Sequence, residues 1–192
     1  MVCTLTEASK TRRKGKGYEM SFSAKGELIY LAHPRTASIA TERALSKIFP
    51  TRSKKTKNHH AQLHEIDYRQ GDEKIFTTIR DPLDMITSWW EAQTSRHHIG
   101  LTRFIQEYKH SMMERNGHLF YFLEDAHEHL RFENLQIDFD RLMLKWGYSP
   151  RILEVTNVTK NKKPFMEYHT EETIAAMWKR WPKDMDMYHG IS

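Results

Sequence analysis

The sequence predicts an α/β domain of three layers, in which a parallel sheet is flanked by helices on both faces. Two stretches, Glu27–Ala32 and Lys74–Ile79, are apolar and rich in β-branched or aromatic residues, as buried strands are. After a short turn, each is followed by a segment with helical spacing: Ile39–Ile48 after the first, and Pro82–Trp90 after the second. Strands that alternate with helices favour a parallel sheet, because the helix returns the chain to the start of the next strand.

Later segments extend this pattern along the chain. We expect helices over Leu101–Met113, Asp138–Lys145 and Thr170–Arg180, a strand over His127–Phe132, polar loops over Thr51–Asn58 and Asn157–Pro164, and either a helix or a strand over His118–Leu123. Residues 21–192 are expected to form a single domain, preceded by a basic, flexible tail over residues 1–20.

Composition limits the classes of protein to consider. No run of about 18 apolar residues occurs, so no membrane span is expected. The single cysteine, Cys3, excludes an internal disulfide, and the first residues have no apolar stretch like that of a secretory signal, so we expect a cytoplasmic protein. The formal net charge of +5 favours anionic partners, whether a nucleotide, an acidic substrate or nucleic acid.

The segment Leu28–Leu45, LIYLAHPRTASIATERAL, joins the first strand to the first helix through small and hydroxylic residues. Backbone N–H groups and the positive end of a helix dipole converge at such a turn, where phosphate or sulfate binds well. Arg35 adds a positive charge, and hydroxyl donors are expected from Thr36, Ser38 and Thr41. It is not a Walker A loop, because GxxxxGK[ST] is absent. An ordinary strand-to-helix turn without a ligand is the alternative.

The segment KIFTTIRDPLDMITSWW places Arg80 at the end of the second strand and Ser88 eight residues later. An arginine fork together with a hydroxyl suits a phosphate monoester, provided that the chain between the two residues folds over the same anion. The alternative is that Arg80 pairs with Asp81 or Asp84 and that Ser88 lies on the helix surface.

Both segments resemble motifs of the sulfotransferases that use 3′-phosphoadenosine 5′-phosphosulfate, in particular small bacterial and phage-type enzymes related to uronosyl 2-O-sulfotransferase. Pro34–Ser38 is similar to the P-[KR]-[ST]-[GA]-[ST] loop that holds the 5′-phosphosulfate. Arg80–Trp90 is similar to the 3′-phosphate motif R-[DN]-P-x-[DE]-x-x-x-S-x-[YW]. Weaker similarities, such as HLRFENL and the lysine-rich segment after Asn157, extend the resemblance over roughly Glu27–Ile191.

The resemblance implies the P-loop-like sulfotransferase fold and a set of residues that bind the donor. These are Arg35, Thr36, Ala37, Ser38, Ile39, Ala40, Thr41, Arg80, Ser88 and Lys162, with Lys160 and Lys163 as alternatives to Lys162. The chain departs from the family at Ile39-Ala40, where Thr or Ser is usual, so a sulfotransferase fold that has lost activity is a further alternative.

The implied reaction is an in-line transfer of a sulfuryl group to a hydroxyl or amine, on a small molecule or a glycan, with adenosine 3′,5′-bisphosphate as product. A histidine suits the role of general base near neutral pH. The resemblance places His60 in this role beside Arg35, with His59, His64, Glu65 and Asp67 as alternatives. His60 and His64 have a spacing that metal ligands can use, but no metal is expected.

Two functions of other classes compete with this interpretation. A P-loop-like nucleotide-binding protein or kinase could use the same strand-turn-helix unit. A basic module could bind nucleic acid through Lys10–Lys16 and the lysines near Lys55, although we do not expect nucleic acid as the partner. The sequence specifies neither the acceptor nor the oligomeric state.

Overall fold

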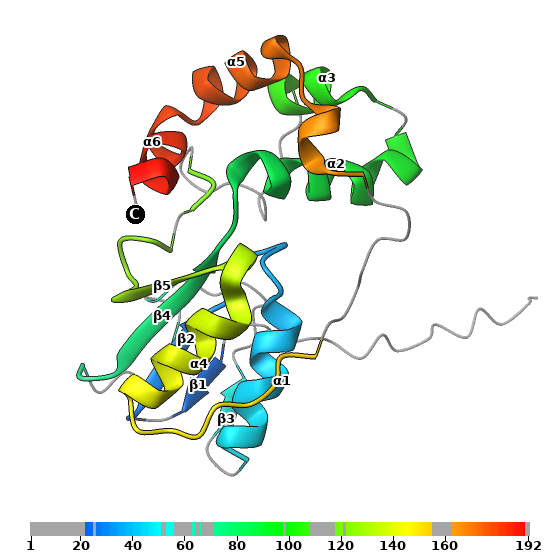
Figure 1. Ribbon diagram of the computed structural model, residues 1–192. Helices are drawn as coiled ribbons and strands as arrows, with labels where there is room; N and C mark the ends of the chain where they lie inside the picture. Colours follow the sequence, from blue (N-terminus) through cyan, green and yellow to red (C-terminus); the bar gives the residue numbers. More distant parts are fainter. Residues whose placement is uncertain are drawn as a thin grey trace, which may run out of the picture.

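The computed structural model describes residues 22–24, 26–50, 53–55, 63, 66, 71–97, 99–107, 118–120, 122–154 and 163–190. These residues form an α/β fold with a five-stranded sheet in the order β3-β1-β2-β4-β5 (Figure 1). The strands are β1 (Phe22–Ala24), β2 (Leu28–Leu31), β3 (Ser53–Lys55), β4 (Lys74–Ile79) and β5 (Glu128–Arg131). The strands expected over Glu27–Ala32, Lys74–Ile79 and His127–Phe132 are therefore confirmed.

The sheet is mixed, whereas the sequence predicted a parallel one. β2, β4 and β5 are parallel, with Tyr30 opposite Phe76 and Thr78 opposite Leu130. β1 is antiparallel to both β2 and β3. Only residues 25–27 separate β1 from β2, too few for the crossover that parallel strands need. β3 also corrects the loop expected over Thr51–Asn58.

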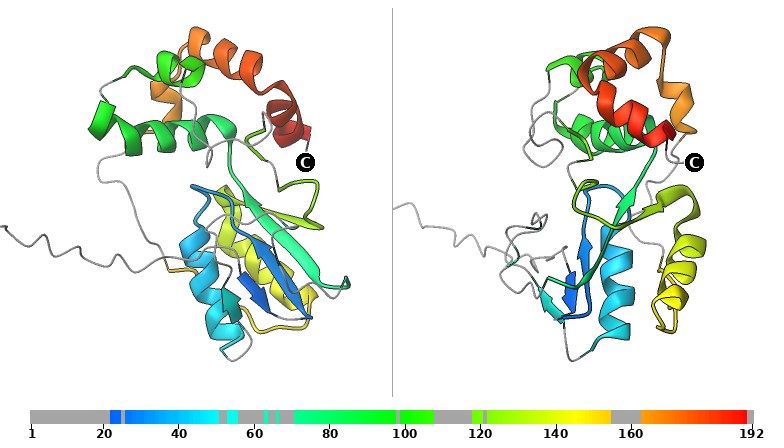
Figure 2. Two further views of the ribbon diagram at one scale, coloured as in Figure 1. Left: turned by 180° about the vertical axis from the view of Figure 1, so that it is seen from behind. Right: turned by 90° about the vertical axis from the view of Figure 1, so that its left-hand side faces the viewer.

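Helices α1 (Ser38–Ile48) and α4 (Leu135–Lys145) lie on the same face of the sheet, as both views in Figure 2 show. Their core side chains pack with those of one sheet face: Tyr30, Ala44, Leu45, Phe76, Phe139, Leu142 and Met143. Ile29, Leu31 and Ile75 point to the other face, where they pack with Leu63, Ile66, Phe122 and Ala126. Within the described residues, the expectation of helices on both faces is wrong.

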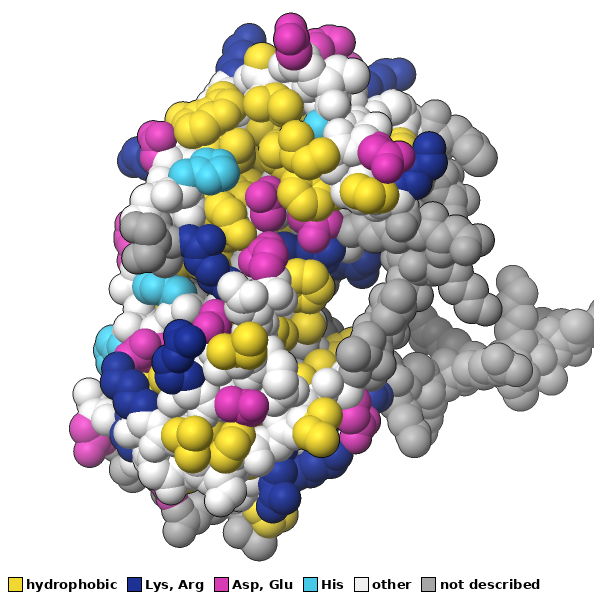
Figure 3. Space-filling view, viewed as in Figure 1, with side chains coloured by type: hydrophobic (Ala, Val, Ile, Leu, Met, Phe, Trp, Pro, Cys, Tyr) yellow, Lys and Arg dark blue, Asp and Glu magenta, His cyan; other side chains and the backbone are white. Residues whose placement is uncertain are grey.

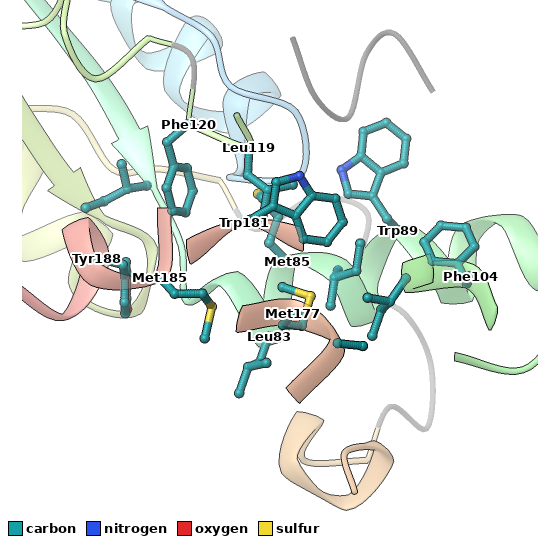
Figure 4. Close-up of a cluster of buried hydrophobic side chains, with 14 of the residues drawn as sticks. Leu83, Met85, Trp89, Phe104, Leu119, Phe120, Met177, Trp181, Met185 and Tyr188 are labelled. Atoms are coloured by element: carbon teal, nitrogen blue, oxygen red, sulfur yellow. The ribbon is translucent and has the colours of Figure 1, made fainter. Parts of the chain in front are cut away.

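The remaining helices form a layer beyond the carboxyl ends of the parallel strands (Figure 1). They are α2 (Pro82–His97), α3 (Leu101–Glu107), α5 (Glu171–Arg180) and α6 (Pro182–Gly190), with the 3₁₀ turn η3 (Phe165–Tyr168). Their shared core includes Trp89 of α2 and Trp181 (Figure 4). Thr170 caps α5 in a capping box with Thr173, at the predicted start of that helix.

Two parts of this layer differ from the expectation. The described residues of His118–Leu123 are neither helix nor strand, although Leu119 and Phe120 are buried in the core of the layer. The helix α6, which begins at Pro182, was not expected. No helix among the described residues is both long and apolar enough to cross a membrane.

Candidate functional site

The turn that follows β2 has a backbone conformation that residues other than glycine rarely adopt. Arg35 and Ala37 have positive φ angles of 65° and 60°, in the left-handed region that disfavours residues with a Cβ atom. Each such residue costs about 1–2 kcal/mol and persists only where the surroundings hold it in place.

A chain of buried hydroxyl groups holds this turn against the sheet. Thr36 donates its hydroxyl to the His33 carbonyl at 2.8 Å, and its Oγ1 lies 2.6 Å from Thr78 Oγ1. Thr78 in turn lies 3.0 Å from the Tyr30 hydroxyl, and burial raises the pKa of Tyr30 to about 12. One proton order satisfies all of these contacts, with Tyr30 donating to Thr78 and Thr78 to Thr36.

This packing corrects part of the sequence expectation, which offered Thr36 and Thr41 as hydroxyl donors to a ligand. Thr36 is fully buried and its hydroxyl is engaged with β2 and β4. Thr41 is also buried, and it donates to the Ala37 carbonyl at 3.4 Å. The hydroxyl groups of Thr36 and Thr41 are therefore engaged within the fold.

The N-terminus of α1 begins directly at this turn. Ala37 is the N-cap and has no side-chain oxygen, and the first turn of the helix carries no acidic residue. The amide N–H groups of the first turn and the positive end of the helix dipole are attractive to an anion at such a position. Ser38 and Ala40 are buried here, and Ile39 is half-buried.

Arg35 connects the two sequence motifs. Its Nη2 donates to Ser88 Oγ at 2.9 Å and to the Ser88 carbonyl at 3.1 Å, and its Nε donates to Ser88 Oγ at 3.1 Å. The carbonyl of Arg35 accepts a hydrogen bond from Arg80 Nη1 at 2.8 Å. Thus the side chain of Arg35 binds one member of the second motif and its main chain binds the other.

Arg80 is fixed on two further sides. Its Nε donates to Asp84 Oδ2 at 2.8 Å, and its Nη2 lies 2.7 Å from the same oxygen, one helical turn along α2. Its Cζ lies 4.2 Å from the ring centre of Phe132, which follows β5. The alternative pairing of Arg80 with Asp84 is therefore present, but Ser88 is buried and does not lie on an exposed helix surface.

Charges of both signs act on Arg35. Burial is the main cause that lowers the pKa of Arg35, and the like charge of Arg80 lowers it further. Glu91 opposes this shift. Two guanidinium groups are thus held close to each other in a partly desolvated place, with Asp84 paired to Arg80 and Glu91 acting on Arg35.

The carboxylates of Asp81 and Glu133 accept backbone N–H groups next to Arg80 and fix the backbone there. Asp81 Oδ1 caps α2 by accepting the N–H of Leu83 at 2.8 Å, and the N–H of Asp81 donates to Glu133 Oε1 at 2.8 Å. The Tyr188 hydroxyl also makes a hydrogen bond with Glu133. Figure 3 shows acidic and basic side chains gathered where the helical layer meets the sheet.

His33 immediately precedes the turn and is a histidine that sequence reasoning overlooked. It is buried, with Nδ1 3.0 Å from the Pro34 carbonyl and Nε2 in contact with the Leu119 carbonyl. Burial lowers the pKa of His33 to about 4, and the neutral ring that this favours has one N–H, so it can donate to only one of the two carbonyl groups. It tethers the turn to residues 118–120 of the helical layer.

The structure brings Arg35 together with Ser88 and Arg80, and so joins the segments that the sequence predicted as a 5′-phosphosulfate loop and a 3′-phosphate site. His60 and Lys162 lie outside the described residues, and so do the alternatives His59, His64, Glu65, Asp67 and Lys160. Lys163 is among the described residues, and its Nζ lies 4.0 Å from Glu167 Oε2. In the described part of the chain, no three His, Cys, Asp or Glu side chains cluster as metal ligands would.

A cavity of about 460 Å³ lies between β5 and α4, and its lining includes none of Arg35, Arg80 and Ser88. Two of its basic side chains already have acidic partners, Lys145 with Glu128 and Arg141 with Asp138. Its lining carries three cationic side chains, Arg131, Arg141 and Lys145, against the carboxylates of Glu128 and Asp138.

Comparisons of the chain with known protein families, curated proteins and solved structures found no match. Function therefore has to be inferred from the residues and contacts of the site. The strongest of these are the contacts of Arg35 with Ser88 and Arg80, which join two segments far apart in the sequence.

Proposed function

We propose that this protein is a sulfotransferase that binds 3′-phosphoadenosine 5′-phosphosulfate at the cluster of Arg35, Arg80 and Ser88. The fold would be that of sulfotransferases, with the donor at the carboxyl ends of the parallel strands β2 and β4. Ligands bind at this edge in open α/β sheets. The acceptor would be a hydroxyl or an amine on a small molecule or a glycan.

One observation carries the proposal. The motif that resembles the 5′-phosphosulfate loop and the motif that resembles the 3′-phosphate site meet at Arg35, which donates to Ser88 and accepts from Arg80. A donor with phosphate groups on both the 3′ and the 5′ oxygen of one ribose needs two anion sites close together. Adjacent parallel strands bring the segments after them together in any such sheet, so the specific support is the bond of the Arg35 guanidinium to Ser88.

The chemistry follows from the charges. The acceptor oxygen or nitrogen forms a bond to sulfur as the bond between sulfur and the bridging oxygen of the 5′-phosphate breaks. Negative charge grows on the leaving 5′-phosphate, where Arg35 and the N–H groups at the start of α1 stabilise it. The proton of the acceptor passes to a general base, for which His60 is the candidate. Arg80 and Ser88 hold the 3′-phosphate and thereby fix the donor for in-line attack.

Binding of the reaction product tests this proposal. Adenosine 3′,5′-bisphosphate is expected to raise the melting temperature of the wild-type protein, and Arg80→Ala is expected to abolish that shift. Arg103→Ala is the matched control, because Arg103 is an exposed arginine that pairs with Glu107 on α3. An equal shift in wild type and Arg80→Ala would overturn the assignment of the 3′-phosphate site.

The same titration separates the competing functions. A nucleotide-binding protein of the kinase type would prefer ATP with Mg²⁺ to the bisphosphate. A nucleic-acid-binding module would bind oligonucleotides in a salt-dependent way and show no preference for the bisphosphate. If the bisphosphate binds, transfer of ³⁵S from labelled donor to a panel of alcohols and amines would identify the acceptor class.

A further inference from the structure

Glu91 lies on α2 one turn beyond Ser88, so the two side chains share a face of the helix. Arg35 is bound to Ser88 Oγ at 2.9 Å and therefore faces the same part of α2. Its Cζ also lies 6.0 Å from the ring centre of Trp89. The charge of Glu91 acts on Arg35 in the sense that favours the protonated guanidinium. Glu91 is thus an acidic neighbour of the anion site and not part of the Arg80–Asp84 pair.

Tyr168 holds Glu91 from the other side. Its ring packs edge-on against Trp90, with ring centres 5.7 Å apart. Its hydroxyl makes a hydrogen bond with Glu91, which is the main cause that raises the pKa of Tyr168. The same hydroxyl accepts the backbone N–H of Lys163 at 3.4 Å. The hydroxyl can therefore donate to Glu91 while it accepts from Lys163.

Hydrogen bonds form a path from the Lys163 backbone through the Tyr168 hydroxyl to the Glu91 carboxylate. From Glu91 the path continues by charge alone, across the face of α2 that carries Ser88, to the Arg35 guanidinium bound there. The segment at one end of this path follows the lysine-rich stretch of the sequence. A carboxylate in this place is not needed to fix Arg80, because Asp84 does so.

We infer that Glu91 is a positioning residue that competes with a bound anion for Arg35 and that Tyr168 holds it in that role. The inference rests on the proposed function, in so far as the anion that binds at Arg35 is a phosphate of the donor or product. In the ligand-free protein, Glu91 partly balances the charge of Arg35. In the complex, it stands close to the negative charge of the ligand and repels it, which weakens product binding and speeds its release.

Calorimetric titration of the full chain with adenosine 3′,5′-bisphosphate tests this role. Glu91→Gln keeps the shape of the side chain and its capacity to accept from Tyr168 but removes the charge. We expect the Kd for the bisphosphate to fall about tenfold, as for removal of one like charge at a partly desolvated site. Glu154→Gln removes the same charge from an exposed pair with Lys47 and is expected to leave the Kd unchanged.

Tyr168→Phe provides a second variant that leaves Glu91 in place. It frees the carboxylate from its hydrogen bond, so the Kd is expected to fall by less than in Glu91→Gln. In the double variant the two changes are expected to be non-additive, with a Kd close to that of Glu91→Gln alone.

The outcomes separate the inference from the proposed function. If the wild type binds the bisphosphate and Glu91→Gln binds it equally or more weakly, the role of Glu91 is wrong while the proposed function stands. If the wild type and Glu91→Gln both fail to bind the bisphosphate, the proposed function itself is wrong, and the inference fails with it.

Discussion

The Arg35 guanidinium donates to the hydroxyl of Ser88 at 2.9 Å, although 53 positions separate the two residues in the sequence. Ser88 is buried, so Arg35 covers its hydroxyl. If the 3′-phosphate binds at Ser88 as proposed, it has to contact or displace the Arg35 guanidinium.

Asp84 is expected to be essential for stability, because it is the carboxylate partner of buried Arg80. Asp84→Asn leaves the guanidinium without its balancing charge in a desolvated place. We expect the free energy of unfolding in urea to fall by about 3 kcal/mol. Glu107→Gln, which breaks the exposed pair with Arg103, should lower it by much less, because solvent screens that pair. Equal effects of the two substitutions would show that burial of the Arg80 pair has no energetic consequence.

Glycine in place of Ala37, the N-cap of α1, is expected to stabilise the protein. The φ of 60° at Ala37 is disfavoured by the Cβ atom, and glycine adopts this conformation without strain. Ala37→Gly should raise the free energy of unfolding by about 0.5–1 kcal/mol. In contrast, Ala175→Gly, at an exposed position inside α5, should lower it by about 1 kcal/mol. A loss of stability in Ala37→Gly would contradict the left-handed conformation of this turn.

His33 should make stability depend on pH. Its pKa is lowered to about 4 by burial, whereas the unfolded chain has a histidine pKa of about 6.5. Between these values the unfolded state binds a proton that the native state does not. The stability that neutral, buried His33 contributes is therefore fully present above about pH 6.5 and is lost as the pH falls through about 4.

Urea unfolding of wild type and His33→Gln between pH 4.5 and 7 measures this contribution. The wild-type free energy of unfolding should rise with pH more steeply than that of the variant, by up to about 1.4 kcal/mol per pH unit. Titration of the carboxylates is common to both proteins and cancels in the difference. Parallel pH profiles would show that His33 is not buried in its neutral form.

The strands and helices that carry the site could be predicted from sequence, because LIYLA and KIFTTI are long enough to show the composition of buried strands. β1 and β3 have only three residues each, too few for any period to be visible. β1 pairs antiparallel with β2 because a short turn connects the two strands, and the sequence did not show where that turn begins. α1 and α4 pack on the same face of the sheet because of the path that the chain takes between them. The spacing of apolar residues within a segment does not predict that path.

The candidate site was predictable only in part for a similar reason. Arg80 and Ser88 were expected to converge on one anion; in the structure each binds Arg35, Arg80 at its carbonyl and Ser88 at its side chain, because the carboxyl ends of β2 and β4 are adjacent. Phe132 and Glu133 follow β5 and reach Arg80 and Asp81 because β5 pairs with β4. The inward direction of the Thr36 hydroxyl depends on Thr78 and Tyr30, which sequence spacing alone does not bring together.

The most direct test of the proposed function is whether the site prefers a nucleotide that carries a 3′-phosphate. Adenosine 3′,5′-bisphosphate and adenosine 5′-monophosphate differ only in the phosphate that Arg80 and Ser88 are proposed to hold. By calorimetry, the wild type is expected to bind the bisphosphate at least about tenfold more tightly, and Ser88→Ala should lose most of that preference. Equal affinities of the wild type for the two nucleotides would contradict the proposal.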